Sequence, residues 1–337
     1  MAAREAAGTL LVTGGAGYIG SHVCKAAAIA GYLPVTFDSL AGGHRHAVRW
    51  GPLEVGDLRD GPRIRAALER WRPAAVVHLA GLIDTAESVA DPGRYYLHNV
   101  VASMTLLDAM RQAGVASLIF SSSAAVYGEP AYAPIDEAHP CAPLSPYGAS
   151  KMMVERILRD YAGPYGVTSV ALRYFNAAGA DPDGEIGEAH PTETHLVPLV
   201  LEALAGRRKS ISVHGTDYDT RDGTCVRDYI HVGDLADAHV LAVKFLEEQQ
   251  QKGAHAFNLG SGEGATVREI IEAAGRLANR PVPVTFGARR PGDPAVLLAN
   301  PRRAQRQLGW KPVRSDVETI IATAWAWHRK AWCINAA

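Results

Sequence analysis

The chain has 337 residues, with 34 lysines and arginines against 35 aspartates and glutamates, so its formal net charge is −1. This balance excludes an overall polycation for nucleic acid or an anionic membrane, and the length suits one large or two interleaved domains. The first residues lack the apolar core of a signal peptide, and no run reaches the roughly 18 apolar residues of a membrane span. Cys24, Cys141, Cys225 and Cys333 show no CxxC spacing. We therefore expect a cytoplasmic protein with free thiols and with neither nucleic acid nor membrane as a partner.

The chain begins with an expected strand, a glycine turn and a helix. Leu10 to Val12 is a short apolar run, followed by the sequence TGGAGYIG (13–20) and an Ala-rich helix to about Ala30. This order is typical of the phosphate-binding start of a Rossmann unit. Gly14 permits the tight turn, Gly17 lets the backbone approach a pyrophosphate, and Gly20 allows close helix–strand packing. The N–H groups at the start of the helix, at Tyr18 and Ile19, would face the anion.

A second expected strand, Pro34 to Phe37, ends at Asp38, a carboxylate about 20 residues beyond the glycines that can accept hydrogen bonds from an adenosine ribose. This position favours NAD over its 2′-phosphorylated form. The alternative stays open, because basic side chains that could hold a 2′-phosphate follow shortly. They are His44, Arg45, His46 and Arg49.

Two further strands are expected before residue 80. Leu53 to Val55 leads into Asp57 and Leu58, where the carboxylate could hydrogen-bond an adenine amino group; alternatively Asp57 or Asp60 caps the helix that begins near Pro62. Ala75 to Leu79 reads as a buried strand, and the small residue Ala80 after it lets the backbone approach a cofactor. His78, inside this apolar run, is expected to be a hydrogen-bonded core histidine rather than a ligand.

The next elements continue the alternation of helix and strand. A helix containing Tyr95 to Met110 carries Asn99, Val115 to Ser121 is a strand, and Val167 to Arg173 is the sixth strand, which ends at Tyr174. Strands and helices alternate without a hairpin. The sequence therefore predicts an α/β fold with a Rossmann-type doubly wound, largely parallel sheet and helices on both faces.

The stretch from Ser121 to Lys151 carries the expected chemistry. Tyr147 lies four residues ahead of Lys151 on a helix that continues to about Tyr161, so the phenol and the ammonium share one face. A cation there can stabilise a phenolate, which makes Tyr147 a candidate base. Ser123 emerges at the carboxyl end of a strand, where open α/β sheets bind ligands, and is the expected third member. The alternative interpretation is an ordinary exposed tyrosine–lysine pair.

The second half changes character. Residues 181–194 form a loop rich in glycine, proline and acidic residues, followed by an expected helix from His195 to Ala205, a short strand at Ile211 to Val213 and a polar loop from Tyr218 to Cys225. These features suggest an inserted substrate-binding portion. The chain is then expected to return to the sheet through residues 228–230, a helix near 234–247 and a strand at 256–259. A smaller C-terminal lobe is completed by a helix at 266–277, a strand at 282–286 and a last helix. We predict an NAD-binding Rossmann domain over 1–175, with its sheet completed by about 228–259, and an interleaved substrate-binding lobe over 176–227 and 260–337.

Together with the glycine turn and the tyrosine–lysine pair, further motifs occur in a specific order along nearly the whole chain. They are YFNAAG (174–179), HPTETHLVP (190–198), RDYIHV (227–232) and RPGD (290–293). With these motifs the chain resembles the UDP-glucose 4-epimerase family of the extended short-chain dehydrogenase/reductase superfamily, from about Leu10 to Lys311. The resemblance implies reversible 4-epimerisation of UDP-sugars, with UDP-glucose and UDP-galactose as substrates and tightly bound NAD as cofactor.

The resemblance also implies roles for the central residues. Tyr147, as phenolate, would take the proton of the sugar 4-hydroxyl while the C4 hydride passes to NAD, and rotation of the resulting 4-keto sugar would let the hydride return to its other face. A tyrosine titrates near ~10, so Lys151 and the positive nicotinamide ring are expected to lower its pKa. Lys151 is also expected to bind the nicotinamide ribose, and Ser123 to hydrogen-bond the sugar oxygen.

The resemblance implies two binding sites and no metal. The NAD site comprises Gly14, Gly17, Tyr18, Ile19, Gly20, Asp38, Asp57, Leu58, Ala80, Asn99, Tyr147, Lys151 and Tyr174. The UDP-sugar site comprises Ser123, Tyr147, Asn176, His195, Leu196, His214, Arg227, Arg289, Asp293 and Leu297. In the second set, Asn176 and the two arginines are expected on the diphosphate, which the planar guanidinium suits. Asp293 is expected on the uridine ribose, His195 and Leu196 near the nucleotide, and His214 where an aromatic residue often faces uracil. Asn99 is also expected close to the sugar.

Three departures from the family pattern concern the substrate. Ala125 stands where threonine is frequent, and Ile83 stands where some relatives have a basic residue. Leu297 lies where enzymes restricted to unsubstituted hexoses often carry a bulky tyrosine. We hypothesise that Leu297 leaves room for an N-acetyl group, so that UDP-N-acetylhexosamines are alternative substrates. UDP-pentoses are a further alternative, which does not depend on Leu297.

Two other functions compete with epimerisation on this fold, and the resemblance also implies an oligomeric state. A nucleotide-sugar dehydratase or decarboxylase needs an added acid and base just after the active-site hydroxyl, whereas this chain has Ala124 and Ala125 there. A non-catalytic NAD-sensing protein is the second competitor, and such proteins commonly lack the tyrosine–lysine pair. The expected assembly is a homodimer joined by the helices around Tyr95–Ala113 and Tyr147–Tyr161.

Overall fold

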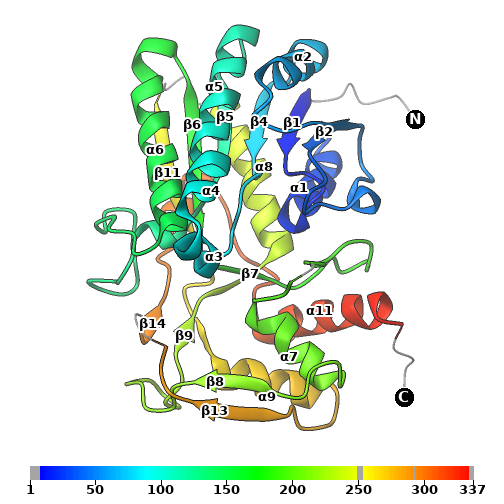
Figure 1. The fold of residues 1–337 in the computed structure, drawn as a ribbon, viewed down its shortest axis with the longest axis vertical. Coiled ribbons are helices and arrows are strands. Elements are labelled where there is room, and N and C mark those ends of the chain that lie inside the picture. Colours follow the sequence, from blue (N-terminus) through cyan, green and yellow to red (C-terminus); the bar gives the residue numbers. More distant parts are fainter. Residues whose placement is uncertain (1–7, 191, 249–252, 291–292, 334–337) are drawn as a thin grey trace.

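The computed structural model describes residues 8–190, 192–248, 253–290 and 293–333 (Figure 1). Its upper half in that view is built on one seven-stranded sheet. In spatial order the strands are β11 (Ala254–Leu259), β6 (Thr168–Tyr174), β5 (Ser117–Ser123), β4 (Ala75–His78), β1 (Thr9–Thr13), β2 (Leu33–Asp38) and β3 (Leu53–Val55). All neighbouring strands pair in parallel. This is the doubly wound, Rossmann-type sheet that the sequence predicted, and the prediction is confirmed.

The sheet is buried on both faces, which explains why its strands are nearly continuous apolar runs. Along β1, Leu10 and Val12 enter one core and Leu11 enters the other, because successive side chains of a strand point to opposite faces. Helices α1 (Tyr18–Ile29) and α8 (Val232–Glu248) close the first core. Helices α2 (Gly61–Trp71), α5 (Ala102–Ala113) and α6 (Pro146–Tyr165) close the second. The strand order reverses at β1, so the crevice outside the carboxyl ends of β1 and β4 is where such folds bind ligands.

The helix predicted to contain Tyr95 to Met110 is present as one continuous helical stretch, but its geometry changes along its length. Helix α3 (Thr85–Ala90) and helix α4 (Pro92–Tyr95) are followed by a π-helical segment, Tyr96–Val101, which runs directly into α5. A π-helical turn holds one extra residue and is frequent at functional sites. Here it buries Asn99.

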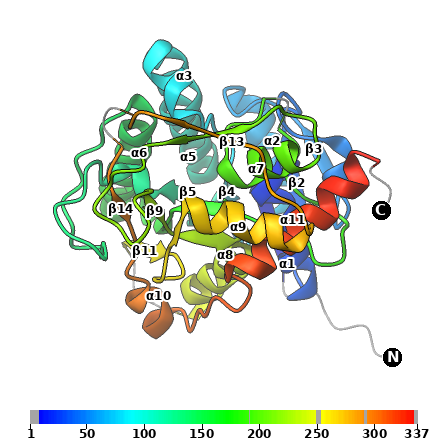
Figure 2. The same ribbon diagram turned by 90° about the horizontal axis from the view of Figure 1, so that it is seen from below.

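The lower half in Figure 1 is a smaller lobe with its own core. Its helices are α7 (Leu196–Leu204), α9 (Val267–Leu277) and α11 (Val317–Ala331), which lie together in the view from below (Figure 2). Two small sheets complete it: β8 (Ile211–His214) with β13 (Val284–Gly287), and β12 (Ala265–Thr266), β9 (Val226–Arg227) and β14 (Val296–Leu297). Helix α9 begins with a capping box between Thr266 and Glu269.

The structure differs from the predicted division of the chain in two places. Residues 228–230 do not return to the central sheet, because β10 (Tyr229–His231) pairs with β7 (Asn176–Ala178) in a separate two-stranded sheet. Only β11 joins the large sheet. In addition, α10 (Arg302–Gln307) and Trp310 belong to the Rossmann half, because Ala304, Leu308 and Trp310 are buried in the core beside α8.

The four cysteines are free thiols, as predicted. Cys24 and Cys225 are buried, and burial raises the pKa of Cys24 to about 12. Among the residues that the structure describes, no helix combines the length and the apolar character needed to cross a membrane.

Candidate active site

The glycine turn between β1 and α1 leaves no room for side chains. Gly14 has φ +72°, and a Cβ there would lie 2.7 Å from the backbone nitrogen of Ala80. A Cβ on Gly20 would lie 2.1 Å from the carbonyl oxygen of Gly14. Helix α1 has no side-chain N-cap and no acidic residue in its first turn, so its first N–H groups remain available to an anion. The turn therefore fits a pyrophosphate group held by the backbone.

Asp38 is held at the carboxyl end of β2 and faces this turn. Its two carboxylate oxygens accept hydrogen bonds from the backbone N–H groups of Ala16 (3.0 Å) and Leu40 (2.8 Å). Two of the four basic residues beyond it are engaged elsewhere: Arg49 pairs with Glu185 at 3.1 Å, and His44 Nε2 lies 2.8 Å from the carbonyl oxygen of Ala189; Arg45 and His46 are exposed. The buried carboxylate facing the turn favours a free ribose over a 2′-phosphate.

The structure shows which aspartate caps the helix that follows β3. Asp60, rather than Asp57, caps α2, because its side chain accepts a hydrogen bond from the backbone N–H of Arg63 at 3.0 Å. Asp57 binds Arg59 through both oxygens, at 3.0 Å to Nε and 2.6 Å to Nη2. These hydrogen bonds lower the pKa of Asp57 to about 2. Leu58 beside it is buried, and contact of this pair with adenine remains a prediction.

Tyr147, Lys151 and Ser123 are brought together at the carboxyl end of β5. Helix α6 starts at Pro146 and is capped by Ser145, whose side chain accepts from the N–H of Gly148, which places Tyr147 in the first turn. Lys151 lies one turn on; its Nζ donates to the carbonyl oxygen of Ser121 at 2.8 Å and lies 5.8 Å from the centre of the Tyr147 ring. All three side chains are buried, so the alternative of an exposed tyrosine–lysine pair is wrong.

The charges at this site do not yet favour a phenolate. Burial raises the pKa of Tyr147, and its hydrogen bond with Ser123 only partly opposes that effect. Burial also lowers the pKa of Lys151 to about 8, because an ammonium is costly to desolvate. The low tyrosine pKa expected from the sequence is therefore not a property of these side chains alone. It needs a further positive charge beside the phenol.

The residues after Ser123 offer no second acid or base. Ala124–Val126 forms one turn of 3₁₀ helix, and the Ser123 side chain caps it by accepting a hydrogen bond from the N–H of Ala125 at 3.1 Å. Methyl groups therefore stand where a dehydratase would need a carboxylate.

Asn99 links the loop after β4 to α6. Its side chain accepts from the N–H of Leu82 (2.8 Å) and donates to the carbonyl oxygen of Leu82 (3.0 Å) and to Ser150 (3.1 Å). A Cβ built on Gly81 would lie 3.0 Å from Asn99 Oδ1 and 3.9 Å from Lys151 Nζ. The amide is thus beside the candidate lysine, although its own groups are used to fix the loop. His78 is a satisfied core histidine, as predicted, with Thr13 and Ser103 each at 2.8 Å.

A buried polar network beneath the site was not predicted. Arg173 donates to Glu155 through Nε (2.8 Å) and Nη2 (2.5 Å), and to the hydroxyl of Tyr127 through Nη1 (2.8 Å). Ser122, next to Ser123, donates to the same glutamate at 2.7 Å, and Tyr127 donates to Asn258 at 2.6 Å. The network thereby joins α6 to β5, β6 and β11. The sequence held one signal for it, since Glu155 follows Lys151 by one helical turn and Arg173 directly precedes Tyr174.

The predicted phosphate and ribose residues form one cluster in the smaller lobe. Arg227 forms an ion pair with Asp293, and Asn176 donates from its side chain to the carbonyl oxygen of Asp228 at 3.0 Å. Asp228 is fully buried, and its carboxylate accepts from the backbone N–H groups of Ser261 (2.6 Å), Gly262 (3.0 Å) and Ala299 (3.0 Å). Sequence reasoning missed Asp228, although it lies inside the RDYIHV motif.

Arg289 is held at the edge of this cluster by Asp217 and Tyr218. Its Nε donates to Asp217 at 2.8 Å, and its guanidinium lies 4.3 Å from the centre of the Tyr218 ring. Burial raises the pKa of Tyr218, and the charges of Asp293, Arg289 and Arg227 also act on the phenol. Arg289 therefore packs on Tyr218, an aromatic ring that the sequence did not single out. His214 ends β8, opposite Gly287.

Leu297 lies between the two parts of the site. It is opposite Arg227 in the pairing of β14 with β9. Its side chain packs against a small apolar cluster of Val126, Tyr127 and Ile135, which also contacts Ala124. The residue is therefore close to the chain that directly follows Ser123.

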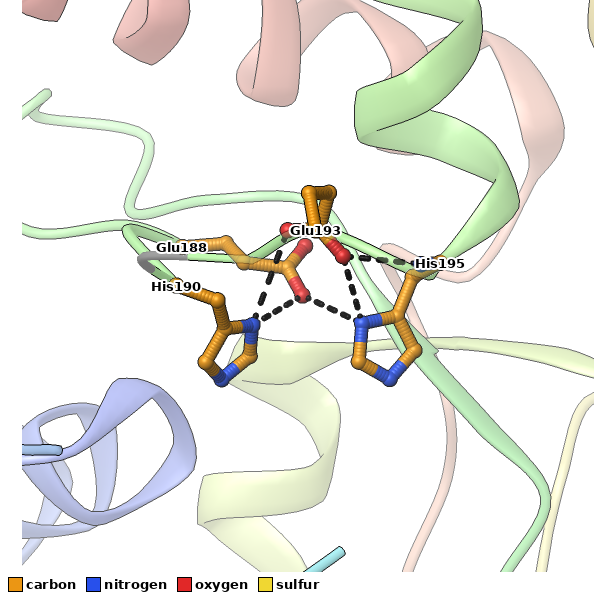
Figure 3. A group of neighbouring side chains, drawn as sticks. All are labelled: Glu188, His190, Glu193 and His195. Atoms are coloured by element: carbon orange, nitrogen blue, oxygen red, sulfur yellow. Dashed lines mark hydrogen bonds and ion pairs between the residues drawn. The ribbon is translucent and has the colours of Figure 1, made fainter. Parts of the chain in front are cut away.

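His195 and Leu196 begin α7, but His195 is already bound. Its Nδ1 lies 2.8 Å from Glu193 and 3.0 Å from Glu188 (Figure 3). His190 completes this group, with Nδ1 at 3.1 Å from Glu188. The histidine that we predicted beside the nucleotide thus points its Nδ1 into a cluster of its own loop.

Both halves of the molecule line a cleft over the glycine turn. The Rossmann half contributes residues of the glycine turn and α1 and of the loop after β2, and the other side is formed by residues of the loop after β7 and by Trp327. The lining residues are Ala16, Gly17, Tyr18, Ser21, Gly42, His44, His46, Ala47, Ile186, Gly187, Ala189, His190 and Trp327. The hydroxyl of Tyr18 also bridges the halves by donating to the carbonyl oxygen of Gly179 at 2.6 Å.

Comparison with known proteins agrees with this geometry. Residues 10–260 match the NAD dependent epimerase/dehydratase family. A UDP-glucose 4-epimerase of Rhizobium leguminosarum bv. trifolii is 51% identical over 325 residues, which cover 96% of this chain and 98% of that protein. The crystal structure of the Brucella ovis UDP-glucose 4-epimerase in complex with NAD is similar with a TM-score of 0.92 and 51% identity, covering 95% of this chain and 98% of that one. The enzyme from Stenotrophomonas maltophila, with bound NAD and formylated UDP-arabinopyranose, gives a TM-score of 0.93 and 39% identity over 97% of this chain and 99% of that one.

Proposed function

The chain belongs to the NAD dependent epimerase/dehydratase family, and we propose that it catalyses the reversible 4-epimerisation of UDP-sugars, with UDP-glucose and UDP-galactose as substrates. The observation that carries this proposal is the convergence of Tyr147, Ser123 and Lys151 at the carboxyl end of β5, beside a turn shaped for pyrophosphate. The two residues after Ser123 are alanines, which can act neither as an acid nor as a base on the sugar. Without an added acid or base, the 4-keto sugar is reduced again, which restores the substrate if the same face receives the hydride and gives the epimer if the opposite face does.

The Rossmann half holds the cofactor in this proposal. The glycine turn (Gly14, Gly17 and Gly20) and the start of α1 (Tyr18 and Ile19) take the pyrophosphate, and Asp38 takes the adenosine ribose. The remaining contacts come from Asp57, Leu58, Ala80, Asn99, Lys151 and Tyr174. NAD bound there supplies a hydride acceptor that becomes the donor for the return step.

The side chains of the chain itself handle the proton. Tyr147 removes it from the sugar 4-hydroxyl and later returns it, and Ser123 hydrogen-bonds the same oxygen. Lys151, held by the carbonyl oxygen of Ser121, fixes a cation one helical turn from the phenol. Burial raises the pKa of Tyr147, so the base becomes effective only when a second positive charge is present in the closed site.

The smaller lobe holds UDP while the sugar turns. Arg227 and Arg289 bind the diphosphate together with Asn176, because their planar guanidinium groups can bond two phosphate oxygens each. Asp293 binds the uridine ribose. Arg227 pairs with Asp293, so the residue for the diphosphate and the residue for the ribose lie side by side.

A direct assay tests the proposal. The purified protein is incubated with UDP-galactose without added NAD, and formation of UDP-glucose is followed by chromatography. Tyr147→Phe should lose most of the activity while retaining NAD, and Tyr161→Phe, on the same helix but outside the site, should behave like the wild type. Near-wild-type turnover by Tyr147→Phe would refute the assigned base. Bound NAD without turnover of any UDP-sugar would favour an NAD-sensing protein.

A second candidate substrate class is the UDP-N-acetylhexosamines. Leu297 favours it, because this residue packs near the chain after Ser123 and is smaller than a tyrosine. The prediction is that the protein epimerises UDP-N-acetylglucosamine and that Leu297→Tyr removes this activity at least tenfold more than activity on UDP-galactose. Equal losses on both substrates would contradict the assignment.

We also propose a homodimer joined through α5 and α6. Leu97, Val101 and Met104 are exposed apolar residues at helical spacing on the π-helical segment and α5, and Met153 is exposed on α6. Such a stripe is costly to leave in water. Light scattering at micromolar concentration should give twice the mass of the chain, and Val101→Glu should lower it; a wild-type protein that is only monomeric would end this proposal.

The free cysteines support a location in the cytoplasm. Cys141 and Cys333 are exposed thiols, which persist in a reducing compartment. Fractionation of cells should recover the protein with cytoplasmic markers, and recovery with secreted or membrane fractions would contradict this location.

A further inference from the structure

Four potential metal ligands converge in the loop between β7 and α7. They are Glu188, His190, Glu193 and His195, which lie within one short stretch of chain (Figure 3). The donor atoms of the four side chains all lie within 4.8 Å of one another. The mechanism proposed above uses none of these donor atoms.

The spacing of these atoms is within about 0.6 Å of the edges of a small coordination tetrahedron. With metal–ligand bonds of about 2.0–2.1 Å, neighbouring ligands of zinc lie about 3.3–3.4 Å apart. Here His190 Nδ1 lies 3.1 Å from Glu188 Oε1 and 3.6 Å from Glu193 Oε2. His195 Nδ1 lies 3.0 Å from Glu188 Oε1 and 2.8 Å from Glu193 Oε1. Figure 3 shows both imidazoles directing this nitrogen at the two carboxylates.

The carboxylates are buried, and against the opposing effect of burial they raise the pKa of His190 to about 9 and that of His195 to about 10. Protons on these imidazoles therefore compensate the carboxylates, and a metal ion would have to replace them. The side chain of Glu188 is 5% exposed and that of Glu193 is 9% exposed, and within the described part of the chain their ion pairs are only with the two histidines. A neighbouring acidic group shows the contrast: Asp181, Asp183 and Glu185 are compensated by Lys25, whose Nζ lies 2.7, 2.7 and 2.9 Å away. Buried charges need such compensation.

One of the imidazole nitrogens is also unsatisfied. Nδ1 of His190 is buried and makes no hydrogen bond of good geometry with any described residue, although carboxylate oxygens lie beside it. A nitrogen that points at oxygens without a proper hydrogen bond is suited to share a metal ion with them. This is a second observation, independent of the spacing.

The surroundings fix the ligands in place. Oε1 of Glu193 accepts hydrogen bonds from the backbone N–H groups of Thr194 and His195, both at 2.8 Å. The indole of Trp327 donates to the carbonyl oxygen of Glu188 at 2.9 Å. Outer contacts of this kind orient metal ligands and strengthen binding.

We propose that Glu188, His190, Glu193 and His195 form a structural site for a divalent transition-metal ion, with zinc as the ion that fits best. Two nitrogen and two carboxylate ligands suit zinc, and four protein ligands leave no open position for catalysis. The metal fastens the loop that precedes α7 and lies beside the cofactor turn, where the rings of His190 and Tyr18 are 6.4 Å apart. The sequence predicted no metal site, since these residues do not follow a familiar ligand spacing.

Metal content and spectroscopy test this proposal without reference to activity. The full-length protein is treated with a chelator, dialysed against micromolar zinc, and analysed by plasma mass spectrometry; one ion per chain is expected. Cobalt substituted for zinc should give the intense visible absorption of a tetrahedral ion. His190→Asn and Glu193→Gln should each weaken binding at least tenfold, since loss of a ligand should cost no less than the roughly 10–100-fold that loss of an outer contact costs.

Matched controls separate this site from general binding to acidic groups. Asp183→Asn removes an exposed carboxylate of the neighbouring acidic group, and His98→Asn removes a histidine elsewhere; both should bind one zinc ion like the wild type. Zinc should also raise the melting temperature of the wild type but not of His190→Asn, a comparison that holds even if the variant is less stable. Absence of stoichiometric zinc, a cobalt spectrum of octahedral type, or unchanged binding by both ligand variants would overturn the proposal in favour of a metal-free cluster of ion pairs.

Discussion

Replacing Arg173 by methionine should destabilise the protein far more than removal of an exposed arginine on the adjoining helix. Arg173 makes two hydrogen bonds to Glu155 and one to Tyr127. Without the guanidinium, a carboxylate that is only 3% exposed stays in the core with the Ser122 hydroxyl as its remaining partner. Removal of one member of a buried ion pair costs about 3–5 kcal/mol, because the other charge is left uncompensated.

The control is Arg156→Met on α6. Arg156 lies next to Glu155 and pairs with Asp160 at 3.0 Å, but the two side chains are 71% and 57% exposed. Exposed pairs of this spacing contribute about 0.3–0.5 kcal/mol. The two variants therefore remove the same type of side chain from ion pairs at the same helix, and they differ mainly in burial.

Equilibrium unfolding in urea at pH 7, followed by tryptophan fluorescence and far-UV circular dichroism, measures both free energies. Coincident transitions would justify a two-state treatment. A double variant, Glu155→Gln with Arg173→Met, should lose less than the sum of the two single losses, because it leaves no unpaired charge. A loss below 1 kcal/mol for Arg173→Met, or one equal to that of Arg156→Met, would refute the role assigned to the buried network.

Two further predictions concern the cofactor turn and acid stability. Gly20→Ala should reduce the NAD retained by the purified protein at least tenfold, since its Cβ would lie 2.1 Å from the Gly14 carbonyl oxygen. The control is Gly163→Ala, because the space around Gly163 is open. Full retention of NAD by Gly20→Ala would contradict the tight turn. Unfolding free energy should fall as the pH drops from about 6.5 towards 4, because histidines that stay neutral in the folded core become protonated in the unfolded chain, each contributing up to about 1.4 kcal/mol per pH unit. Burial lowers the pKa of these histidines to about 3 or 4: His22, His78, His231 and His239. Urea titrations at pH 7 and pH 5 that give equal stability would show this explanation to be wrong.

The features that were predicted from the sequence are those with a local cause. The glycine turn, Asp38 and the positions of Tyr147 and Lys151 follow from spacing within one strand–turn–helix unit or one helix, so a linear pattern was enough to place them. The doubly wound, parallel character of the sheet followed from the alternation of strands and helices without a hairpin.

The features that were missed depend on partners far away in the chain. The strand at Tyr229–His231 has the same apolar pattern whether it joins the large sheet or pairs with β7, and only the fold decides. Trp310 lies in the core of the first half because it donates to the carbonyl oxygen of Asp234 at 2.8 Å and packs beside α8. The pKa shifts of Tyr147 and Lys151 were also missed, because they result from burial, and burial is not visible in a sequence.

The path of the chain between the two halves has a consequence for folding. After β6 it enters the smaller lobe at β7, returns with α8, leaves again after β11, comes back with α10 and ends in α11. Neither half is a continuous piece of sequence, so neither can be excised as a single segment. Many native contacts join residues far apart in the chain. Such topologies fold slowly, because the entropy cost of closing large loops comes before the contacts form. The protein should therefore assemble as one cooperative unit, and a nick in the crossing segments would destabilise the sheet and the smaller lobe together.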